Sequence, residues 1–142
     1  MSNFPPAENS TRLVFCRENV DPEEVSRLLG LVPSEAVRVG EPLSYGNGYA
    51  RVSHLGIWKL DLPGACGADS VEEQIGYWLM LLEPLAGAFE QLRQMGYAPY
   101  LDCKASQGSL SLCVDPAVLV RIGNLNIALS VWLYEQSTAN DA

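Results

Sequence analysis

Histidine is almost missing from the sequence, because His54 is the single one in the chain. A nucleophilic serine or cysteine needs a base beside it, so any Ser–His–Asp or Cys–His arrangement, including one that uses Cys113, must pass through His54. That residue stands in the segment 51–56, RVSHLG, which is no nucleophile elbow. We therefore expect no catalytic residue and no enzyme activity. An enzyme that uses His54 is the alternative that stays open.

Cysteine is also sparse and follows no metal-binding pattern. No C-x-x-C pair and no Cys–His pair at zinc-ligand spacing occurs among the four cysteines, Cys16, Cys66, Cys103 and Cys113. We expect buried free thiols, no metal and no cofactor. Cys103 and Cys113 flank a predicted tight turn, and a turn at Gln107–Gly108 would pair Cys103 with Leu112. Cys113 would then lie on the other face, so these two cysteines should not form a disulfide.

Basic residues are few: nine lysines and arginines stand against seventeen aspartates and glutamates, which gives a net charge of -8. An acidic chain without a basic run is repelled by the phosphate backbone, so we expect no nucleic-acid partner. No stretch approaches the roughly 20 apolar residues that cross a bilayer. Residues 1–8 have neither the cationic part nor the apolar part of a signal peptide. We expect a soluble, cytoplasmic protein with no membrane partner.

The chain is long enough for one domain with its own core, and we treat residues 1–142 as that domain. The chain contains an internal repeat: residues 20–31, VDPEEVSRLLGL, resemble residues 114–125, VDPAVLVRIGNL. Each copy follows an alternating apolar run and places Asp as N-cap, Pro at the first helical position and Gly at the end, at Gly30 and Gly123. A strand-then-helix unit used twice favours a pseudo-twofold, ferredoxin-like arrangement.

A long helix is predicted between Ser70 and Gly96. Ser70 and Glu73 have the spacing of a capping box, and apolar residues then recur at helical spacing up to Gly96. Pro84 lacks a backbone N–H and clashes with the preceding turn, so we expect a kink or a break near residues 80–83. Residues 77–82 are apolar or aromatic on more than one face. Either a second layer or another subunit should pack there.

Residues 33–54 follow no clear pattern and contain the turn sequence GNG at 46–48. A connection this long is uncommon in a compact domain, so we predict a long loop or β-arm, with a protruding hairpin favoured. Arg38 and Glu41 form the polar cluster of this stretch, and Tyr45 flanks the turn. Arg38 with Glu41 is a candidate recognition site, and an ordinary salt-bridged loop arginine is the alternative.

Two alternating segments predict half-buried strands. In residues 57–62 Trp58 faces inward and Lys59 outward. This alternation favours a core role for Trp58 over a role as a surface on which a ligand stacks. In residues 126–134 the odd-numbered positions form one apolar face, and the other face carries Trp132 and Tyr134. If helices cover the odd face, these aromatics form a dimer or ligand surface, unless the N-terminal segment 1–10 or the arm covers them. The polar tail 135–142 is expected to fray.

Several segments keep an order and spacing that resemble a known family. They are 12–17, RLVFCR; 21–25, DPEEV; 28–34, LLGLVPS; 38–41, RVGE; 56–60, GIWKL; and 82–85, LEPL, between Trp78 and the pair Gly96–Tyr97. Over nearly the whole chain these resemble a bacterial family known as domain of unknown function 4279. This chain has Ala36–Val37 where that family more typically has a bulky residue. The resemblance implies a small, acidic, single-domain α+β protein and supplies no active site.

We predict an α+β fold: an antiparallel sheet of five or six strands with one long and two short helices on one face. For function we favour a non-enzymatic protein–protein interaction domain that binds a protein partner, or a second copy as a homodimer, through the arm 33–54 or the outer sheet face. One version is a neutralising partner of a basic protein, because the net charge of -8 would speed that encounter.

The alternative function is a small-molecule sensor with a cleft between sheet and arm. Arg38 would meet an anion there, and Trp58 or Tyr45 would supply apolar contact. The candidate binding residues of both hypotheses are Arg38, Glu41, Tyr45, His54, Trp58, Trp132 and Tyr134.

Overall fold

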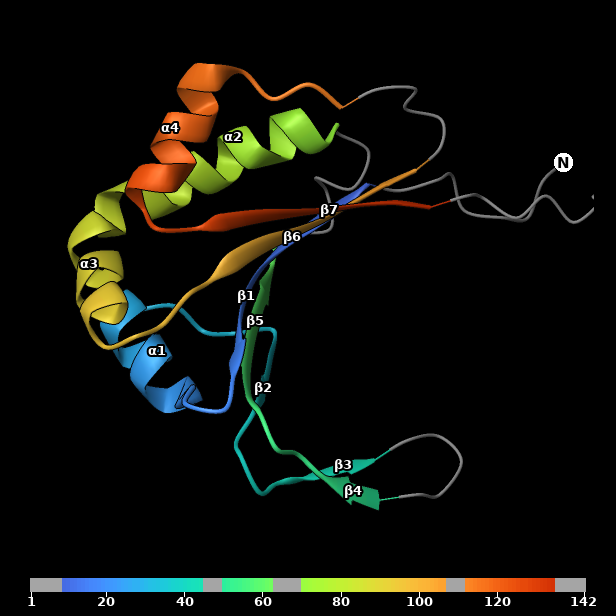
Figure 1. Ribbon diagram of the computed structural model, residues 1–142, viewed down its shortest axis with the longest axis vertical. Helices are drawn as coiled ribbons and strands as arrows, with labels where there is room; N and C mark the ends of the chain where they lie inside the picture. Colours follow the sequence, from blue (N-terminus) through green and yellow to red (C-terminus); the bar gives the residue numbers. More distant parts are fainter. Residues whose placement is uncertain (1–8, 45–49, 63–69, 107–111, 135–142) are drawn as a thin grey trace, which may run out of the picture.

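The computed structural model describes residues 9–44, 50–62, 70–106 and 112–134 (Figure 1). These residues form a five-stranded sheet in the order β2-β5-β1-β6-β7 and a separate two-stranded hairpin of β3 and β4. The predicted α+β fold is confirmed, and the sheet is antiparallel except that β6 and β7 run parallel. The strands are β1 (Ser10–Arg17), β2 (Glu35–Val37), β3 (Pro42–Ser44), β4 (Ala50–Val52), β5 (Gly56–Asp61), β6 (Tyr100–Ser106) and β7 (Ala128–Tyr134).

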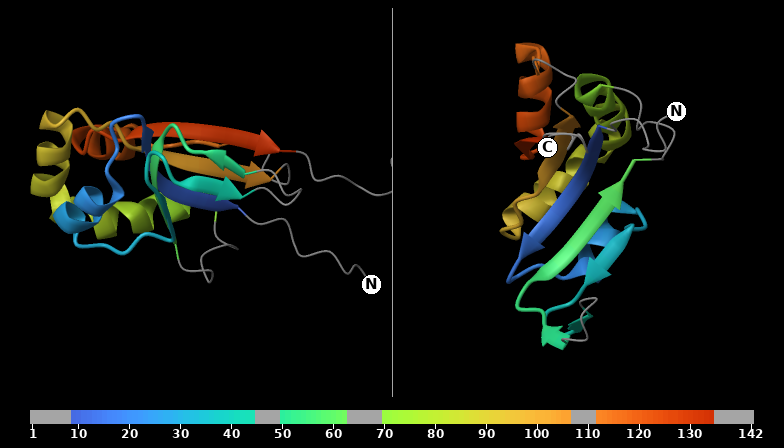
Figure 2. Two further views of the ribbon diagram at one scale, coloured as in Figure 1. Left: turned by 90° about the horizontal axis from the view of Figure 1, so that it is seen from below. Right: turned by 90° about the vertical axis from the view of Figure 1, so that its right-hand side faces the viewer.

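Helices cover one face of the five-stranded sheet (Figures 1 and 2). They are α1 (Pro22–Leu29), α2 (Val71–Leu82), the 3-10 turn η2 (Glu83–Leu85), α3 (Ala86–Gln94) and α4 (Pro116–Asn124). α1 connects β1 to β2, which flank β5, and the segment from α2 to α3 connects β5 to β6, which flank β1. Two strand–helix–strand units are therefore interleaved, and α4 with β7 extends the sheet beyond β6. The ferredoxin-like arrangement and the pseudo-twofold stay predictions. Within the described residues, no helix combines the length and the apolar character needed to cross a membrane.

The predicted long helix is broken at its proline, as expected. Ser70 Oγ accepts the N–H of Glu73 at 3.1 Å and so caps α2, which ends at Leu82. Pro84 lies in η2, and α3 follows directly. Because proline has no N–H for the α-helical ladder, the chain tightens into 3-10 geometry at this point. α4 packs beside α2. It supplies part of the second layer that the apolar stretch 77–82 predicts.

The helices of the two copies of the internal repeat begin alike and end differently. Asp21 caps α1, which ends at Gly30 in the left-handed region with φ 67°. Asp115 caps α4 by accepting the N–H of Ala117 at 2.9 Å. The prediction that this helix closes on Gly123 is wrong, because it runs to Asn124 and the left-handed residue is Asn126 with φ 59°. The extra turn carries Leu125 into the core, and Asn tolerates the left-handed conformation better than most residues.

The core lies between the sheet and the helices. Its centre is Phe15 of β1, whose ring meets Trp58 edge-on at 5.6 Å and Tyr97 edge-on at 6.2 Å between ring centres. A buried polar chain ties α2 to β1: the Trp78 indole N–H donates to Thr11 Oγ1 at 2.7 Å, and that hydroxyl donates to Gln74 Oε1 at 2.8 Å. These contacts fasten the helices to this face of the sheet.

The predicted pairing of Cys103 with Leu112 across a tight turn is wrong. β6 has β1 on one side and β7 on the other, so both of its edges are occupied, and Leu112–Val114 form no strand. Leu112 and Val114 instead pack against the core on the way to α4. The predicted turn at Gln107–Gly108 lies outside the described residues. Cys103, which is buried, and Cys113, which is exposed, are both free thiols.

Residues 33–54 contain β2 of the main sheet, followed by the hairpin of β3 and β4, which stands away from that sheet (Figure 1). The base of the hairpin is closed by two backbone hydrogen bonds of 2.8 Å, from the N–H of Gly40 to the Ser53 carbonyl and from the N–H of Ser53 to the Glu41 carbonyl. Gly40 has φ 91°, which a residue with a side chain rarely adopts.

Candidate functional site

Arg38 and Glu41 flank a hollow of about 350 Å³ between α1 and the base of the arm. Its lining consists of Pro22, Glu23, Ser26, Pro33, Ala36, Arg38 and Glu41. The Arg38 guanidinium forms an ion pair with Glu23 of α1. This pair neutralises the charge that the sensor hypothesis assigns to an anion, and it matches the alternative of a salt-bridged loop arginine.

Trp58 lies behind the wall of the same hollow. Its side chain is 0 % exposed, and its indole N–H donates to Ser26 Oγ at 2.9 Å. The ring therefore has no surface to offer a ligand and serves the core, as the alternation of its strand favoured. His54 lies in the exposed bend between β4 and β5. Tyr45 lies outside the described residues.

Trp132 lies on β7, on the sheet face that the helices leave uncovered, and is 62 % exposed. The buried Ile127 and the partly buried Leu129 alternate with it and contact the core. Tyr134 is the last residue of β7. The predicted site residues thus fall in three separate places: the hollow beside α1, the bend at His54 and the uncovered face of β7.

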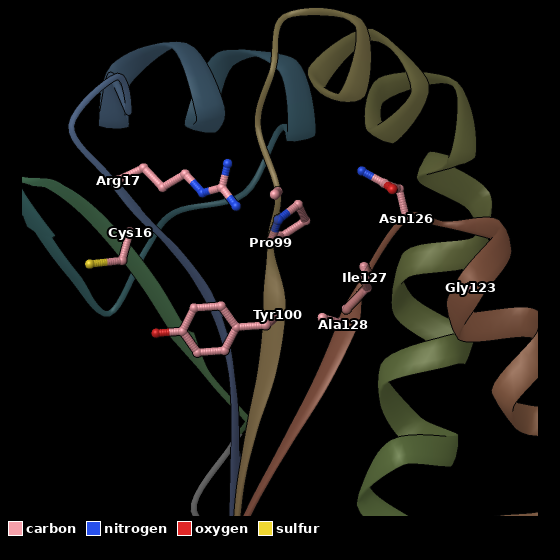
Figure 3. Close-up of a pocket in the computed structure, with 9 residues that line it drawn as sticks. Cys16, Arg17, Pro99, Tyr100, Gly123, Asn126, Ile127 and Ala128 are labelled. Carbon is pink, nitrogen blue, oxygen red and sulfur yellow. The ribbon is translucent and has the colours of Figure 1, made fainter.

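That uncovered face, which we call the open face, carries hollows that the sequence reasoning missed. The first, about 460 Å³, lies where β1 ends and where β6 and β7 begin (Figure 3). Arg17 reaches from β1 towards β6, and Tyr100 extends from β6 over β1 (Figure 3). The lining is Cys16, Arg17, Ala98, Pro99, Tyr100, Gly123, Asn126, Ile127 and Ala128.

Two further hollows adjoin the first. One, of about 590 Å³, is lined by alternate residues of β6 and β7, namely Tyr100, Asp102, Lys104, Ser130 and Trp132. The other, of about 480 Å³, is lined by Cys16, Arg17, Glu18, Asn19 and Leu55. Tyr100 joins the first hollow to the second, and Cys16 with Arg17 joins it to the third. We call the three together the open-face groove.

The groove concentrates cations that have no acidic partner. Six of the nine basic residues of the chain form ion pairs: Arg12, Arg27, Arg38, Lys59, Arg93 and Arg121. Arg17, Arg51 and Lys104 have none among the described residues, and Arg17 and Lys104 both line the groove. In a chain of net charge -8, this places positive charge at both ends of one surface.

Asp102 adds an unsatisfied acceptor to the same surface. Its Oδ1 atom is buried and has no hydrogen-bond donor among the described residues. In the sheet it lies beside Arg12 of β1 and Ser130 of β7, but Arg12 Nε donates to Asp61 at 2.7 Å instead. A buried carboxylate oxygen without a donor costs free energy, and an occupant of the groove can supply one once the Asp102 side chain turns this oxygen outward.

Two titratable groups near Asp102 have a shifted pKa. Burial, followed by the charges of Cys16 and Asp102, raises the pKa of Tyr100 above its ordinary value of 10, so its hydroxyl remains a hydrogen-bond donor into the alkaline range. Burial, with Asp102 as the lesser cause, raises the pKa of Cys103 to about 12, which makes this thiol a poor nucleophile. No group of three metal-ligating side chains occurs in the described ranges. The groove therefore presents hydrogen-bonding, charged and aromatic groups suited to binding.

Sequence reasoning found Trp132 but missed Arg17, Tyr100, Asp102 and Lys104. The alternation of residues 100–105 already places Tyr100, Asp102 and Lys104 on one side of a strand, which is a usable signal. Their proximity to Trp132 follows from the β6–β7 pairing, in which Lys104 lies opposite Trp132.

Comparison with known families matches residues 8–136 to a domain of unknown function, DUF4279, which confirms the resemblance found in the sequence. No curated protein and no solved structure matches the chain.

Proposed function

The chain belongs to the DUF4279 family. We propose that it is a non-enzymatic domain that binds another protein in the open-face groove. One observation carries the proposal: the hollow over β6 and β7 brings together the exposed Trp132 with Lys104 and Oδ1 of Asp102, neither of which has a partner among the described residues. Tryptophan, tyrosine and arginine dominate the energetics of protein interfaces, and Tyr100 and Arg17 continue the same surface.

The shape of the groove favours a polypeptide over a small ligand. Its three hollows follow one another along the sheet, and together they run from Leu55 past Tyr100 to Trp132. A polypeptide segment lying along β6 can place an N–H donor near Asp102 and an acidic side chain near Lys104 or Arg17. Each of these contacts satisfies a group that has no partner among the described residues.

A small-molecule sensor is the second candidate, and the hollow volumes support it. Volumes of about 460 and 590 Å³ fall in the range of roughly 300 to 1,000 Å³ typical of ligand pockets. Arg17 and Asn126 line the first of them and suit an anionic group. This version moves the cleft from the base of the arm to the open face. A cognate ligand would raise the melting temperature of the wild type, and Arg17→Glu would abolish that rise.

The version with a basic partner rests on the net charge of -8, which steers cationic proteins at long range. In the groove Arg17 and Lys104 are accompanied by Glu18 and Asp102, so the lining gives no strong attraction for a cationic side chain. A basic partner would therefore use acidic surface outside the groove for steering and the groove for apolar and hydrogen-bonding contact.

The test compares one charge reversal in the groove with the same reversal on the helix layer. Arg17→Glu changes the groove, while Arg27→Glu changes α1, where Arg27 is 70 % exposed and 3.8 Å from Glu24. Proteins captured by the wild-type chain are compared with those captured by each variant, and direct binding is then measured with the purified partner. We expect Arg17→Glu to weaken binding at least tenfold and Arg27→Glu to leave it unchanged. Equal binding by both variants contradicts the proposal.

A further inference from the structure

β7 is an edge of the five-stranded sheet, and it lacks the usual protection of an edge. Its free side has no neighbouring strand among the described residues, and its sequence, ALSVWLY, contains no charged residue and no proline. Natural edge strands carry lysine, proline or a bulge, or are very short, because an open row of N–H and C=O groups pairs with other chains. The opposite edge, β2, has only three residues and begins with Glu35. β7 alone is long and uncharged.

Apolar side chains accompany this free edge on both faces of the sheet. Val131 is 38 %, Trp132 62 % and Leu133 67 % exposed. α4 is the outermost helix beside this edge (Figure 2). One side of α4 is held to η2 by the ion pair of Arg121 with Glu83. Leu119 projects from the opposite side, because residues two apart in a helix point roughly 160° apart, and it too is exposed.

We propose that the occupant of this edge is a second copy of the chain, paired through antiparallel β7 strands about a twofold axis centred on Val131. In that register Val131 faces its own equivalent, Trp132 faces Ser130, and Leu133 faces Leu129. A large side chain thus meets a small one on the open face, and leucines meet on the helix side. The surface is self-complementary, as a twofold interface must be.

The uncharged β7 edge allows a second copy to bind despite the charge of the chain. Two chains of net charge -8 repel each other, so they can associate only where neither places acidic groups in the contact. β7 supplies an uncharged strip of seven residues for this purpose. The twofold also places both helix layers on one side, so the two open-face grooves lie on a common face. The dimer needs no groove occupant, and the groove proposal needs no dimer.

The first test measures the mass of the full chain in solution by light scattering over a range of concentrations. We expect a concentration-dependent dimer for the wild type and a monomer for Val131→Lys, because the twofold sets two lysines directly opposite each other. Val52→Lys is the matched control, since Val52 is 55 % exposed and lies on β4, in the hairpin that stands away from the main sheet. It should stay dimeric, and so should Arg17→Glu. A wild type that is monomeric throughout, or a dimer that Val131→Lys leaves intact, overturns the proposal.

The second test fixes the register and does not depend on the folding of a lysine variant. In a Cys113→Ser background, Val131→Cys places two thiols opposite each other about 4.5 to 5.5 Å apart at Cα, within disulfide reach. Leu133→Cys places the equivalent thiols about 13 Å apart, because each faces residue 129 of the other copy. We expect a disulfide-linked dimer from the first variant and none from the second under mild oxidation. Equal cross-linking, or none from either, contradicts the twofold at Val131.

Discussion

The backbone carbonyl of Val20 occupies the space where a side chain on Gly56 would begin, since a Cβ atom built on Gly56 falls 1.8 Å from that oxygen. Gly56 starts β5, and Val20 precedes α1, so this contact fixes how the first helix joins the sheet. No rotamer change relieves a clash with backbone. The glycine is therefore required by packing and has no need of a functional explanation.

Gly56→Ala should lower the free energy of unfolding by about 3 kcal/mol or more, because the backbone of β5 or of the β1–α1 connection must shift. Urea denaturation of the purified variant measures this change. Gly76→Ala is the matched control: it lies in α2 with nothing within 4 Å of the added carbon. It should raise stability by about 0.5 to 1 kcal/mol. Similar effects of the two substitutions would show that the Val20 contact is not tight.

Thr11→Val should destabilise the fold by about 1 to 3 kcal/mol although valine has nearly the same shape. The change removes the 2.7 Å acceptor of the buried Trp78 indole N–H and the 2.8 Å hydrogen bond that Thr11 donates to Gln74 Oε1. Thr11→Ser keeps the hydroxyl and should cost less than Thr11→Val in the same urea titration. If Thr11→Val costs no more than Thr11→Ser, the two hydrogen bonds contribute no more to stability than the methyl contact that serine loses, which contradicts the prediction.

Local backbone chemistry made part of the fold predictable. The break at Pro84 and the caps at Asp21, Ser70 and Asp115 depend on residues within a few positions of one another. The alternation of β7 also depends only on local sequence, and it placed Trp132 on the open face. Such features follow from hydrogen-bonding groups and side-chain period alone.

Strand pairing was less predictable, because it depends on contacts between distant segments. The segment 109–114 has the alternation of a strand, but β7 occupies the edge of β6 that it would need. The open-face groove depends on the same pairing, since Arg17, Tyr100 and Trp132 come from three different strands. The hydrogen bond from the Trp58 indole to Ser26 was equally invisible in the sequence.

Cys103 should make the fold less stable at alkaline pH. Its pKa is raised to about 12 in the folded chain by burial, whereas an unfolded thiol titrates near its ordinary value of 9. Above that value the unfolded state has lost a proton that the folded state keeps, so the free energy of unfolding falls as pH rises, by at most about 1.4 kcal/mol per pH unit. Tyr97 and Tyr100, whose pKa values are also raised, act in the same direction at higher pH.

Urea titrations between about pH 8 and pH 11 measure this slope. Cys103→Ala should be less stable than the wild type at neutral pH, because it leaves a small cavity, but its stability should fall less steeply above pH 9. Parallel curves for the two proteins would show that Cys103 does not titrate differently on folding.

Trp132 should be the one tryptophan that a soluble quencher reaches. Trp58 and Trp78 are 0 % exposed, and Trp132 is 62 % exposed, so acrylamide should quench a single fraction of the emission. Trp132→Phe should remove that fraction and shift the remaining emission to shorter wavelength, with a stability change within about 0.5 kcal/mol. A quenchable fraction that survives this substitution would mean that the core opens.

Salt should strengthen the proposed dimer and weaken steering towards a basic partner. Two chains of net charge -8 repel through solvent, and screening over about 10 Å at 0.1 M salt and about 3 Å at 1 M reduces that repulsion. The β7 contact contains no charge to lose, so its dissociation constant should fall as salt is added. Association with a cationic protein should instead slow with salt, because the attraction itself is screened. Sedimentation of the chain alone measures the first effect, and stopped-flow binding of the partner measures the second. A dimer that dissociates in salt would contradict the prediction, because it would require ion pairs that the β7 register does not contain.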